Sequence, residues 1–226
     1  MRPFAIGPAT VSALLLAACA HAPGPAPSAT PTKSTAHNAP VNPANIKRVV
    51  GELPPNYEVT TGIPSRASPR VIWSLEPGAR AKPPQCATLA DPGDDRDQTA
   101  QGFSGSGTGG IVDAVVVALP GPVDLDQRLV AACGGWTMID DHTAASVRLI
   151  DAPHIDGVAT LGMVADTKSS VESGTEIDSR AYTFTAYLGN YYTFTTLTTD
   201  PGSALPPLPP QFVADLLVKT VSTLRS

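Results

Sequence analysis

Five short runs of alternating apolar and polar residues occupy the second half of this 226-residue chain and constrain its fold more than any other feature. Turn-forming residues separate them, among them Asp140-Asp141-His142 and Gly189-Asn190. Alternation with a period of two is typical of strands, and turns this tight join antiparallel neighbours. The sequence therefore predicts an antiparallel meander. Its strands are expected over 136–139, 144–150, 157–166, 180–188 and 191–198.

Helical patterns accompany these strands. They are expected over 45–53, 86–89, 124–132 and 211–225. Asp124 is suited to cap the third of these helices, and the last helix carries one apolar stripe with the helical period. The stripe consists of Phe212, Val213, Leu216, Leu217, Val221 and Leu224. We therefore expect an amphipathic helix at the C-terminus.

Two further strands are expected before the meander, over 71–75 and 111–119. The second is β-branched and apolar almost throughout, which is typical of a central strand buried on both faces. Strands that follow one another, with helices at the two ends, give the α+β class. The expected fold is an antiparallel sheet with a C-terminal amphipathic helix, short helices and one disulfide.

The N-terminus reads as an export signal. Residues 1–18 combine one Arg, a short apolar run and small residues, as in a signal peptide that is removed from the mature protein. Leu16-Ala17-Ala18-Cys19 resembles the bacterial lipobox, in which the Cys thiol receives a diacylglyceryl group and becomes the first residue after cleavage. Two acyl chains hold a protein stably on a bilayer. We therefore predict a lipoprotein anchored through Cys19, with an ordinary secretory cleavage as the alternative.

A tether is expected to follow the lipid over 19–45. Residues 20–45 include six Pro, one charged residue and no aromatic residue. Chain of this composition is extended and cannot bury enough apolar area to fold. The sequence therefore predicts a disordered tether over 19–45 and a single globular domain over 46–226.

Charge and hydropathy argue against two classes of protein. The net charge is −5, and no cluster of Lys and Arg is present to neutralise nucleic-acid phosphates. The longest uninterrupted apolar run covers 13–20, well short of the roughly 18 residues that span a bilayer. We therefore expect neither nucleic-acid binding nor an integral membrane protein.

Three Cys residues are present. If the lipid occupies Cys19, then Cys86 and Cys133 remain as two thiols in a compartment where disulfides persist. Neither has a His or a basic residue beside it in the sequence to activate a nucleophilic thiol. We therefore predict a structural disulfide between Cys86 and Cys133.

Several segments together resemble a known family. They are Pro83-Pro84-Gln85-Cys86, the glycine segment Gly102-Phe103-Ser104-Gly105-Ser106-Gly107, the strand after it and a helix that ends in Cys133. A secreted lipoprotein with these features resembles a family of mycobacterial lipoproteins of unknown function, which is similar to the extracellular sensor domain of a receptor-type Ser/Thr protein kinase. The resemblance covers 46–226. It implies an antiparallel sheet with helices and a cleft for an unidentified ligand, and it implies no catalytic residue.

Two Asp–His segments are the candidates for chemistry. Asp140-Asp141-His142 and His154-Ile155-Asp156 could supply an acid–base pair or metal ligands. Both fall where turns are expected, and Asp is common in turns because its side chain accepts hydrogen bonds from nearby amides. We therefore expect no metal and no catalytic residue. An envelope hydrolase that uses Asp141/His142 and His154/Asp156 remains the alternative.

The glycine segment matches a dinucleotide-binding fingerprint by its letters, from Gly105 to Gly110. That fingerprint works only where a strand leads in and a helix leads out. Here a polar loop precedes the glycines and a strand follows them. We therefore expect no cofactor and interpret the segment as a flexible turn beside a ligand cleft, with Gly105 and Gly107 as candidate ligand-binding positions.

The hairpin over 180–198 holds six of the twelve aromatic residues. With Gly189-Asn190 as its turn, Tyr187 lies opposite Tyr192, and Phe194 is on the same face. This face is expected to lie under the C-terminal helix, with an exposed binding platform as the alternative. Tyr187, Tyr192 and Phe194 are therefore candidate ligand-binding residues.

These patterns predict a non-enzymatic cell-envelope lipoprotein with a ligand-binding or protein-interaction domain that is sensor-like. It is expected on the outer face of the plasma membrane. The expected partners are the membrane, through diacylglyceryl Cys19, and an unknown small-molecule, lipid or protein ligand.

Overall fold

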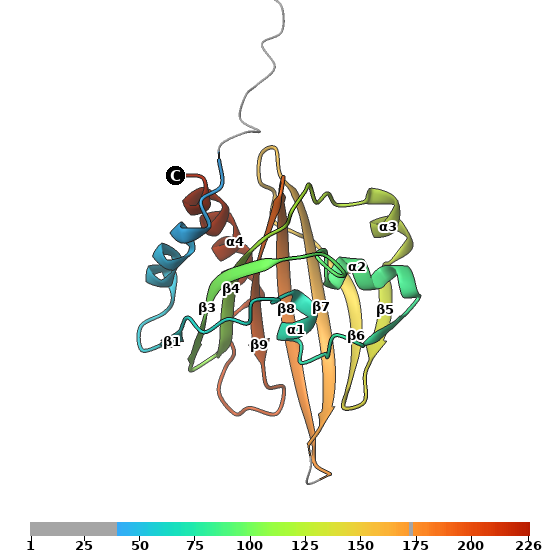
Figure 1. Ribbon diagram of the computed structural model, residues 1–226. Coiled ribbons are helices and arrows are strands. Elements are labelled where there is room, and N and C mark those ends of the chain that lie inside the picture. Colours follow the sequence, from blue (N-terminus) through green and yellow to red (C-terminus); the bar gives the residue numbers. More distant parts are fainter. Residues whose placement is uncertain (1–39, 172–173) are drawn as a thin grey trace, which may run out of the picture. The chain divides into compact units, whose positions relative to one another are not determined.

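The computed structural model describes residues 40–171 and 174–226. In this part of the chain, nine strands form one antiparallel sheet in the order β1-β3-β4-β9-β8-β7-β6-β5-β2 (Figure 1). The strands are β1 (Glu58–Thr60), β2 (Arg80–Lys82), β3 (Thr99–Gly107), β4 (Gly110–Ala118), β5 (Gly135–Ile139), β6 (Thr143–Ile150), β7 (Ala159–Ser170), β8 (Glu176–Leu188) and β9 (Tyr191–Thr199). The helices are η2 (Pro43–Glu52), α1 (Pro69–Ile72), η3 (Pro84–Cys86), α2 (Ala87–Ala90), α3 (Gln127–Ala132) and α4 (Pro210–Leu224). The predicted α+β class is confirmed.

The predicted meander is confirmed as β5 to β9, in which each strand pairs with the next one along the chain. The Gly189-Asn190 turn joins β8 to β9, so Tyr187 pairs with Tyr192 as predicted. Gly189 has a φ of 70°, a conformation that glycine adopts without steric cost. β7 and β8 are longer than expected, because β7 continues to Ser170 and β8 begins at Glu176.

The sheet separates two cores, because alternate side chains of a strand point to opposite faces. On one face, which we call the α1 face, the core includes Trp73 and Phe194. On the other, the α4 face, the core includes Phe103 and Leu217. Figure 1 shows α1 in front of the sheet. β4 contributes buried residues to both cores, as predicted for a central strand over 111–119.

The predicted C-terminal helix is confirmed as α4. Its apolar stripe faces the sheet and is buried apart from Phe212, which is half-buried. α4 contacts β4, β8 and β9 of the sheet and also packs on η2. η2 is the helix predicted over 45–53, and the Asn42 side chain caps its start. The backbone amide of Asn42 also donates to the carbonyl of Leu224 at 2.8 Å, which joins the beginning of the described chain to the end of α4.

Three local predictions are wrong. The segment 71–75 is not a strand, because Pro69 begins α1 there and proline is favoured in a first helical turn. Apart from Thr108-Gly109, which joins β3 to β4, the glycine segment is not a turn, because Thr99–Gly107 forms β3 and pairs with β4 along its whole length. The helix predicted from Asp124 begins after Asp126, whose carboxylate accepts hydrogen bonds from the first helical amides.

The predicted signal peptide, Cys19 and most of the predicted tether lie outside the described residues. Within 40–171 and 174–226, no helix combines the length and the apolar character that a membrane crossing requires.

Candidate functional site

The three aromatic candidates of the β8–β9 hairpin lie inside the domain. Tyr192 and Phe194 have no exposed surface, and Tyr187 is 8% exposed. The rings of Tyr192 and Phe194 stack with their centroids 6.2 Å apart. This burial excludes the exposed platform. The expected cover is also wrong, because these side chains lie in the core on the α1 face with Trp73, and α4 packs on the opposite face.

Two hydrogen bonds join the chain that precedes β3 to the α1 face of the sheet. The indole Nε1 of Trp73 donates to Oγ1 of Thr183 on β8 at 3.1 Å. The hydroxyl of Tyr192 donates to the side-chain oxygen of Gln98 at 3.3 Å. Burial raises the pKa of Tyr192, so the hydroxyl remains a donor at neutral pH. The three candidate aromatic residues are therefore part of the hydrophobic core on the α1 face.

A buried ion pair lies within the same part of the chain, before β3. Arg70 on α1 and Asp91 after α2 are 5% and 2% exposed, and their charged groups are 2.9 Å apart. The Ser68 hydroxyl donates to the same carboxylate oxygen at 3.0 Å. Burial raises the pKa of Asp91, and the Arg70 guanidinium opposes that rise. The pair therefore joins α1 to the end of α2.

Gly105 and Gly107 lie on β3 and face the N-terminal part of the domain. A Cβ atom on Gly105 would come within 2.6 Å of the Leu53 side chain, and one on Gly107 within 2.5 Å of the Tyr57 ring. Leu53 and Tyr57 therefore fill the space that side chains at these two positions would occupy. Gly107 also lines a cavity of about 190 Å³, together with Gly109 and Leu205. Because Gly105 and Gly107 have no side chains, the chain between η2 and β1 can pack closely against β3.

The two Asp–His pairs are not brought together. Asp141 and His142 precede β6, and His154 and Asp156 follow it. The eight residues of β6 separate the pairs by about 25 Å, since a strand rises about 3.3 Å per residue. His154 and Asp156 form an exposed contact with each other at 3.0 Å.

The turn before β6 is built by Asp140, as the turn interpretation predicted. Its carboxylate accepts hydrogen bonds from the backbone amides of Glu76, His142 and Thr143. Burial alone would raise the pKa of Asp140, but these amides together lower it.

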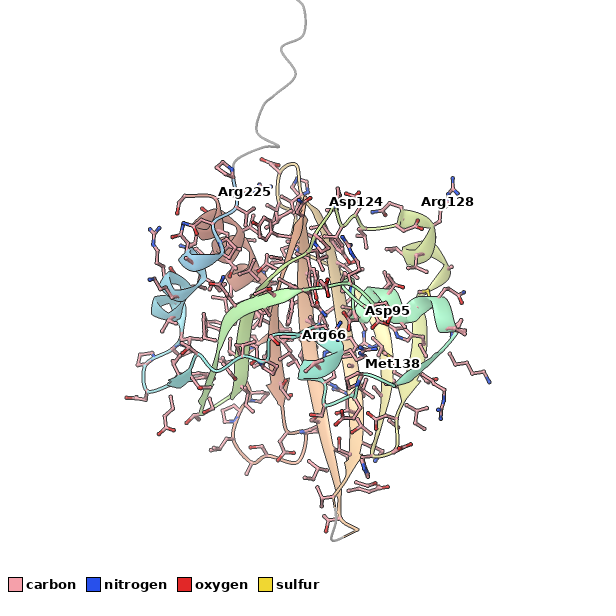
Figure 2. The ribbon with its side chains drawn as sticks, viewed as in Figure 1. Arg66, Asp95, Asp124, Arg128, Met138 and Arg225 are labelled. Atoms are coloured by element: carbon pink, nitrogen blue, oxygen red, sulfur yellow. A yellow bond between two sulfur atoms is a disulfide. The ribbon has the colours of Figure 1, made fainter. Side chains whose placement is uncertain are left out.

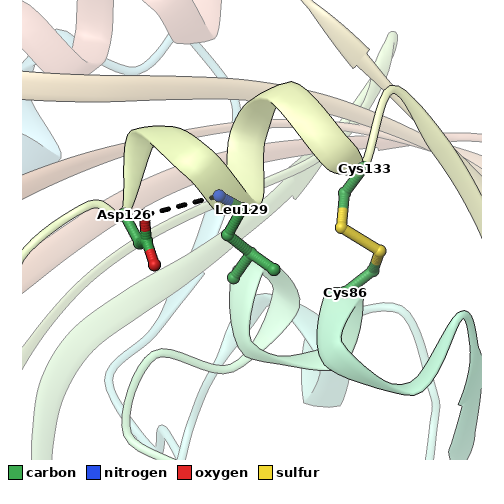
Figure 3. The surroundings of a disulfide bond; sticks show 4 residues. All are labelled: Cys86, Asp126, Leu129 and Cys133. Atoms are coloured by element: carbon green, nitrogen blue, oxygen red, sulfur yellow. Dashed lines mark hydrogen bonds between the residues drawn. A yellow bond between two sulfur atoms is a disulfide. The ribbon is translucent and has the colours of Figure 1, made fainter.

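The structure contains the predicted disulfide between Cys86 and Cys133 (Figure 3). Both residues are fully buried, and Cys133 directly follows α3. Figure 3 shows the bond linking the end of α3 to the η3–α2 segment. It therefore connects the chain before β5 to the cover on the α1 face. The lipidation site Cys19 lies outside the described residues.

A cavity of about 410 Å³ lies at the end of the sheet that carries the β8–β9 turn. Tyr187 contributes to its lining, together with Asp124 and Arg225, which Figure 2 labels. Tyr187 is therefore the candidate aromatic that borders a cavity as well as the core.

A groove of about 670 Å³ lies elsewhere, on the α4 face of the sheet, and we call it the β5–β8 groove. A helix is about 10 Å wide and strands are spaced about 4.8 Å apart, so one helix covers about two strands. α4 makes its main contacts with β4, β8 and β9, so within 40–171 and 174–226 no helix packs extensively on this face of β5 to β7. Met138, labelled in Figure 2, is buried on the α1 side, and the groove lies on the other side of its strand.

Small and apolar side chains form the floor of the β5–β8 groove. Ala144 and Ser146 of β6 are exposed and short, whereas their neighbours on both sides are longer. Ile139 of β5 borders the groove and is 50% exposed. Pro201, from the loop before α4, also contributes. Most of the groove surface is therefore apolar.

Four charged residues line the β7–β8 side of the groove and form two cross-strand ion pairs. Arg180 Nε contacts the carboxylate of Asp166, and Lys168 Nζ lies 2.8 Å from the carboxylate of Asp178. The hydrogen bond to Asp178 raises the pKa of Lys168, and the hydrogen bond to Asp166 raises the pKa of Arg180. Each ion pair therefore stabilises the charged form of its cation.

The sequence reasoning missed the groove. The strand that is β7 was expected to end at Asp166, and the strand that is β8 was expected to begin at Arg180. Lys168 and Asp178 were therefore expected in the loop between them. The spacing Asp166-x-Lys168 and Asp178-x-Arg180 was the available signal, because residues two apart on a strand share a face. In an antiparallel pair these residues meet with opposite charge.

A second missed residue is Asp113, the one charged residue within β4. It is 4% exposed. Burial raises the pKa of Asp113 to about 6, and the neighbouring Ser104 hydroxyl opposes the rise. Between about pH 4 and pH 6 the carboxyl is therefore protonated in the folded domain, whereas it ionises in the unfolded chain.

We expect Asp113 to make the domain less stable as pH rises from about 4 to about 6. Below the unfolded pKa the carboxyl is protonated in both states, whereas above the folded pKa the fold holds a buried charge. The rise of the pKa from its ordinary value of 3.8 to about 6 corresponds to roughly 3 kcal/mol in the free energy of unfolding. Asp113→Asn should remove this loss, so the variant should exceed the wild type in stability at pH 7 and match it near pH 4. Urea unfolding across this range tests the expectation, and parallel pH profiles would contradict it.

One solved structure shares this fold. An X-ray structure of an uncharacterised protein from Mycobacterium smegmatis, the Rv0999 ortholog, matches with a TM-score of 0.60 at 17% identity, over 82% of this chain and 98% of that one. The two proteins therefore share a fold. The extracellular domain of PknH from Mycobacterium tuberculosis matches with a TM-score of 0.44 at 13% identity, over 82% of this chain and 92% of that one. No curated protein matches the sequence.

A family model described as a domain of unknown function, DUF5642, matches residues 42–225. The match begins at the residue that caps η2 and ends one residue after α4, so it spans the whole described domain. The predicted membership of a family of unknown function is confirmed: this chain belongs to the DUF5642 family.

Proposed function

We propose that this protein is a non-enzymatic ligand-binding lipoprotein, held on the outer face of the plasma membrane by a lipid on Cys19, and that its ligand occupies the β5–β8 groove. The observation that carries the proposal is the groove itself. Its volume of about 670 Å³ falls within the range of small-molecule sites, and its apolar surface with a few charged groups matches their usual composition.

Two features support an extracytoplasmic location. The first is the signal sequence with a lipobox-like segment that ends at Cys19. The second is the Cys86–Cys133 disulfide, since such bonds persist in oxidising compartments and are rare in the cytosol. Fractionation of cells tests the anchor, because Cys19→Ala should leave the membrane-bound lipidated form undetected. A lipid-linked mass that persists in this variant would contradict it.

Binding is favoured over hydrolysis by where the polar groups lie. A hydrolase would need an acid, a base or a metal to converge on one substrate position. Asp141/His142 and His154/Asp156 lie at opposite ends of β6 and cannot act on one bond. The groove needs no such convergence, because its apolar floor and paired charges suffice to hold a ligand.

Filling the groove tests the proposed function. Ala144→Trp should occupy the floor of the groove, whereas Ala131→Trp places the same side chain on an exposed face of α3 as the control. The full-length chain would be expressed in Mycobacterium smegmatis and purified from the envelope in mild detergent. Molecules that remain bound would then be identified by mass spectrometry.

We expect an envelope molecule to remain with the wild type and with Ala131→Trp. Its amount should fall about fivefold to 150-fold in Ala144→Trp, because overpacking costs about 1–3 kcal/mol. Equal retention by all three proteins would overturn the proposed site. A wild type that retains nothing would also count against the proposal.

A further inference from the structure

The charges beside the β5–β8 groove alternate in sign in both directions. Along β7, Asp166 is followed on the same face by Lys168, and along β8, Asp178 is followed by Arg180. Across the two strands, Asp166 pairs with Arg180 and Lys168 pairs with Asp178. The four groups therefore have no net charge. A ligand with one charge meets attraction and repulsion at similar distances, whereas a ligand with both charges meets attraction twice.

The two ion pairs are open to exchange with a ligand. The side chains of Lys168 and Asp178 are 62% and 56% exposed, and those of Arg180 and Asp166 are half-exposed. Exposed pairs of this kind contribute about 0–1 kcal/mol each. Each charged group can therefore turn to a ligand group of opposite charge at little cost to the fold.

The floor of the groove suits an apolar chain rather than a second polar group. Ala144 leaves a hollow along β6, and Ile139 and Pro201 add apolar surface on two sides of it. Each CH₂ group that leaves water contributes about 0.8 kcal/mol, so an alkyl chain provides binding energy that the charged groups alone do not. The charged side and the apolar floor are adjacent, which fits a molecule with a polar head at one end of one chain.

We infer that the occupant of the β5–β8 groove is a single-chain zwitterionic phospholipid, with its ammonium facing one of the two carboxylates, its phosphate facing the cation next to that carboxylate, and its acyl chain along Ala144. This inference rests on the proposed function and specifies its ligand. The charge pattern also suits a second copy of this chain, but two hollow surfaces placed face to face would leave the floor of each groove unfilled.

The test measures binding of three amphiphiles with the same alkyl length. The probes are lauroyl lysophosphatidylethanolamine, lauroyl lysophosphatidylglycerol and dodecyltrimethylammonium, which carry zwitterionic, anionic and cationic heads. Each would be titrated below its micellar concentration into the full-length chain with Cys19→Ala, which carries no lipid of its own. We expect the zwitterion to bind about tenfold more tightly than either singly charged probe, because two exposed charge contacts together contribute about 1.4 kcal/mol.

Two matched variants reverse the selectivity in opposite directions. Lys168→Gln with Arg180→Gln keeps the two carboxylates, so the cationic probe should become the tightest. Asp166→Asn with Asp178→Asn keeps the two cations, so the anionic probe should become the tightest. Ala144→Trp should weaken all three probes, and thermal melts would show that each variant is folded.

Three results would overturn the inference. The first is an order of affinities that is the same in the wild type and in both double variants. The second is sedimentation of the wild type as a dimer that Ala144→Trp dissociates, which would make the groove an interface between copies. The third is no binding of the zwitterion although an envelope molecule is lost on Ala144→Trp, in which case the proposed function stands and only this ligand class fails. Retention unchanged by Ala144→Trp defeats the proposed function itself.

Discussion

Replacing Phe194 by alanine should lower the free energy of unfolding by about 3–5 kcal/mol, the usual cost of deleting a buried aromatic side chain. Phe194 has no exposed surface and stacks on Tyr192 in the core of the α1 face. The deletion removes apolar contacts and leaves a cavity that the surrounding strands, fixed in register on both sides, cannot close. Urea unfolding followed by circular dichroism measures the loss.

Phe212 provides the matched control, because it is half-buried on α4 and already meets water. Phe212→Ala removes the same atoms and should cost clearly less than Phe194→Ala. Similar losses for the two variants, or a loss below about 1 kcal/mol for Phe194→Ala, would contradict the burial that places Phe194 in the core.

Removing the Cys86–Cys133 disulfide should lower the free energy of unfolding by about 4 kcal/mol. The bond closes a loop with a sequence separation of 47 residues, and in the chain-entropy model a loop of this length restricts the unfolded chain by that amount. Typical domains are stable by only about 5–15 kcal/mol, so the loss is a large fraction of the total. The Cys86→Ser/Cys133→Ser variant should therefore unfold at a much lower urea concentration than the oxidised wild type.

Chemical reduction of the wild type is the control for this variant, because it opens the bond without changing the side chains from sulfur to oxygen. The reduced wild type should unfold close to the double variant. Peptide mapping without reductant should recover Cys86 joined to Cys133 from the exported protein. Free thiols at both positions, or a double variant as stable as the oxidised wild type, would refute the prediction.

The sequence by itself determined the meander, the C-terminal helix and the disulfide. The signals for the meander and the helix are local in the sequence, and the signal for the disulfide is the even number of Cys residues that remain for pairing. Gly189-Asn190 makes a two-residue turn that sets the register of β8 and β9, and the stripe on 211–225 repeats with the helical period. With Cys19 predicted to carry the lipid, the other two Cys residues were predicted to pair with each other. Such features require no knowledge of what lies across the fold.

Short segments were decided by tertiary contacts. The apolar run 71–75 suits a helix or a strand by pattern alone, and its packing against the sheet through Trp73 makes it part of α1 and the loop that follows. The glycines of β3 weaken a strand in isolation, yet their missing side chains admit Leu53 and Tyr57 against a strand that β4 already pairs. In β3 the local propensity was therefore overridden by tertiary contacts, whereas at α1 the first-turn Pro69 and the packing of Trp73 favour the same conformation.

The tertiary structure alone decided which face each helix covers and where the sheet stays open. The stripe of α4 indicated that it would bury an apolar face, but the pattern is the same whichever side of a hairpin it meets, so Phe194 was assigned the wrong cover. The β5–β8 groove exists because the helices on the α4 face are narrower than the sheet. η2 and α4 together cover β3, β4, β9 and β8 on this face, whereas the described sheet has nine strands. Because each helix is only about two strands wide, the described helices leave part of the remaining strands open on this face, and the small and charged side chains there form the groove.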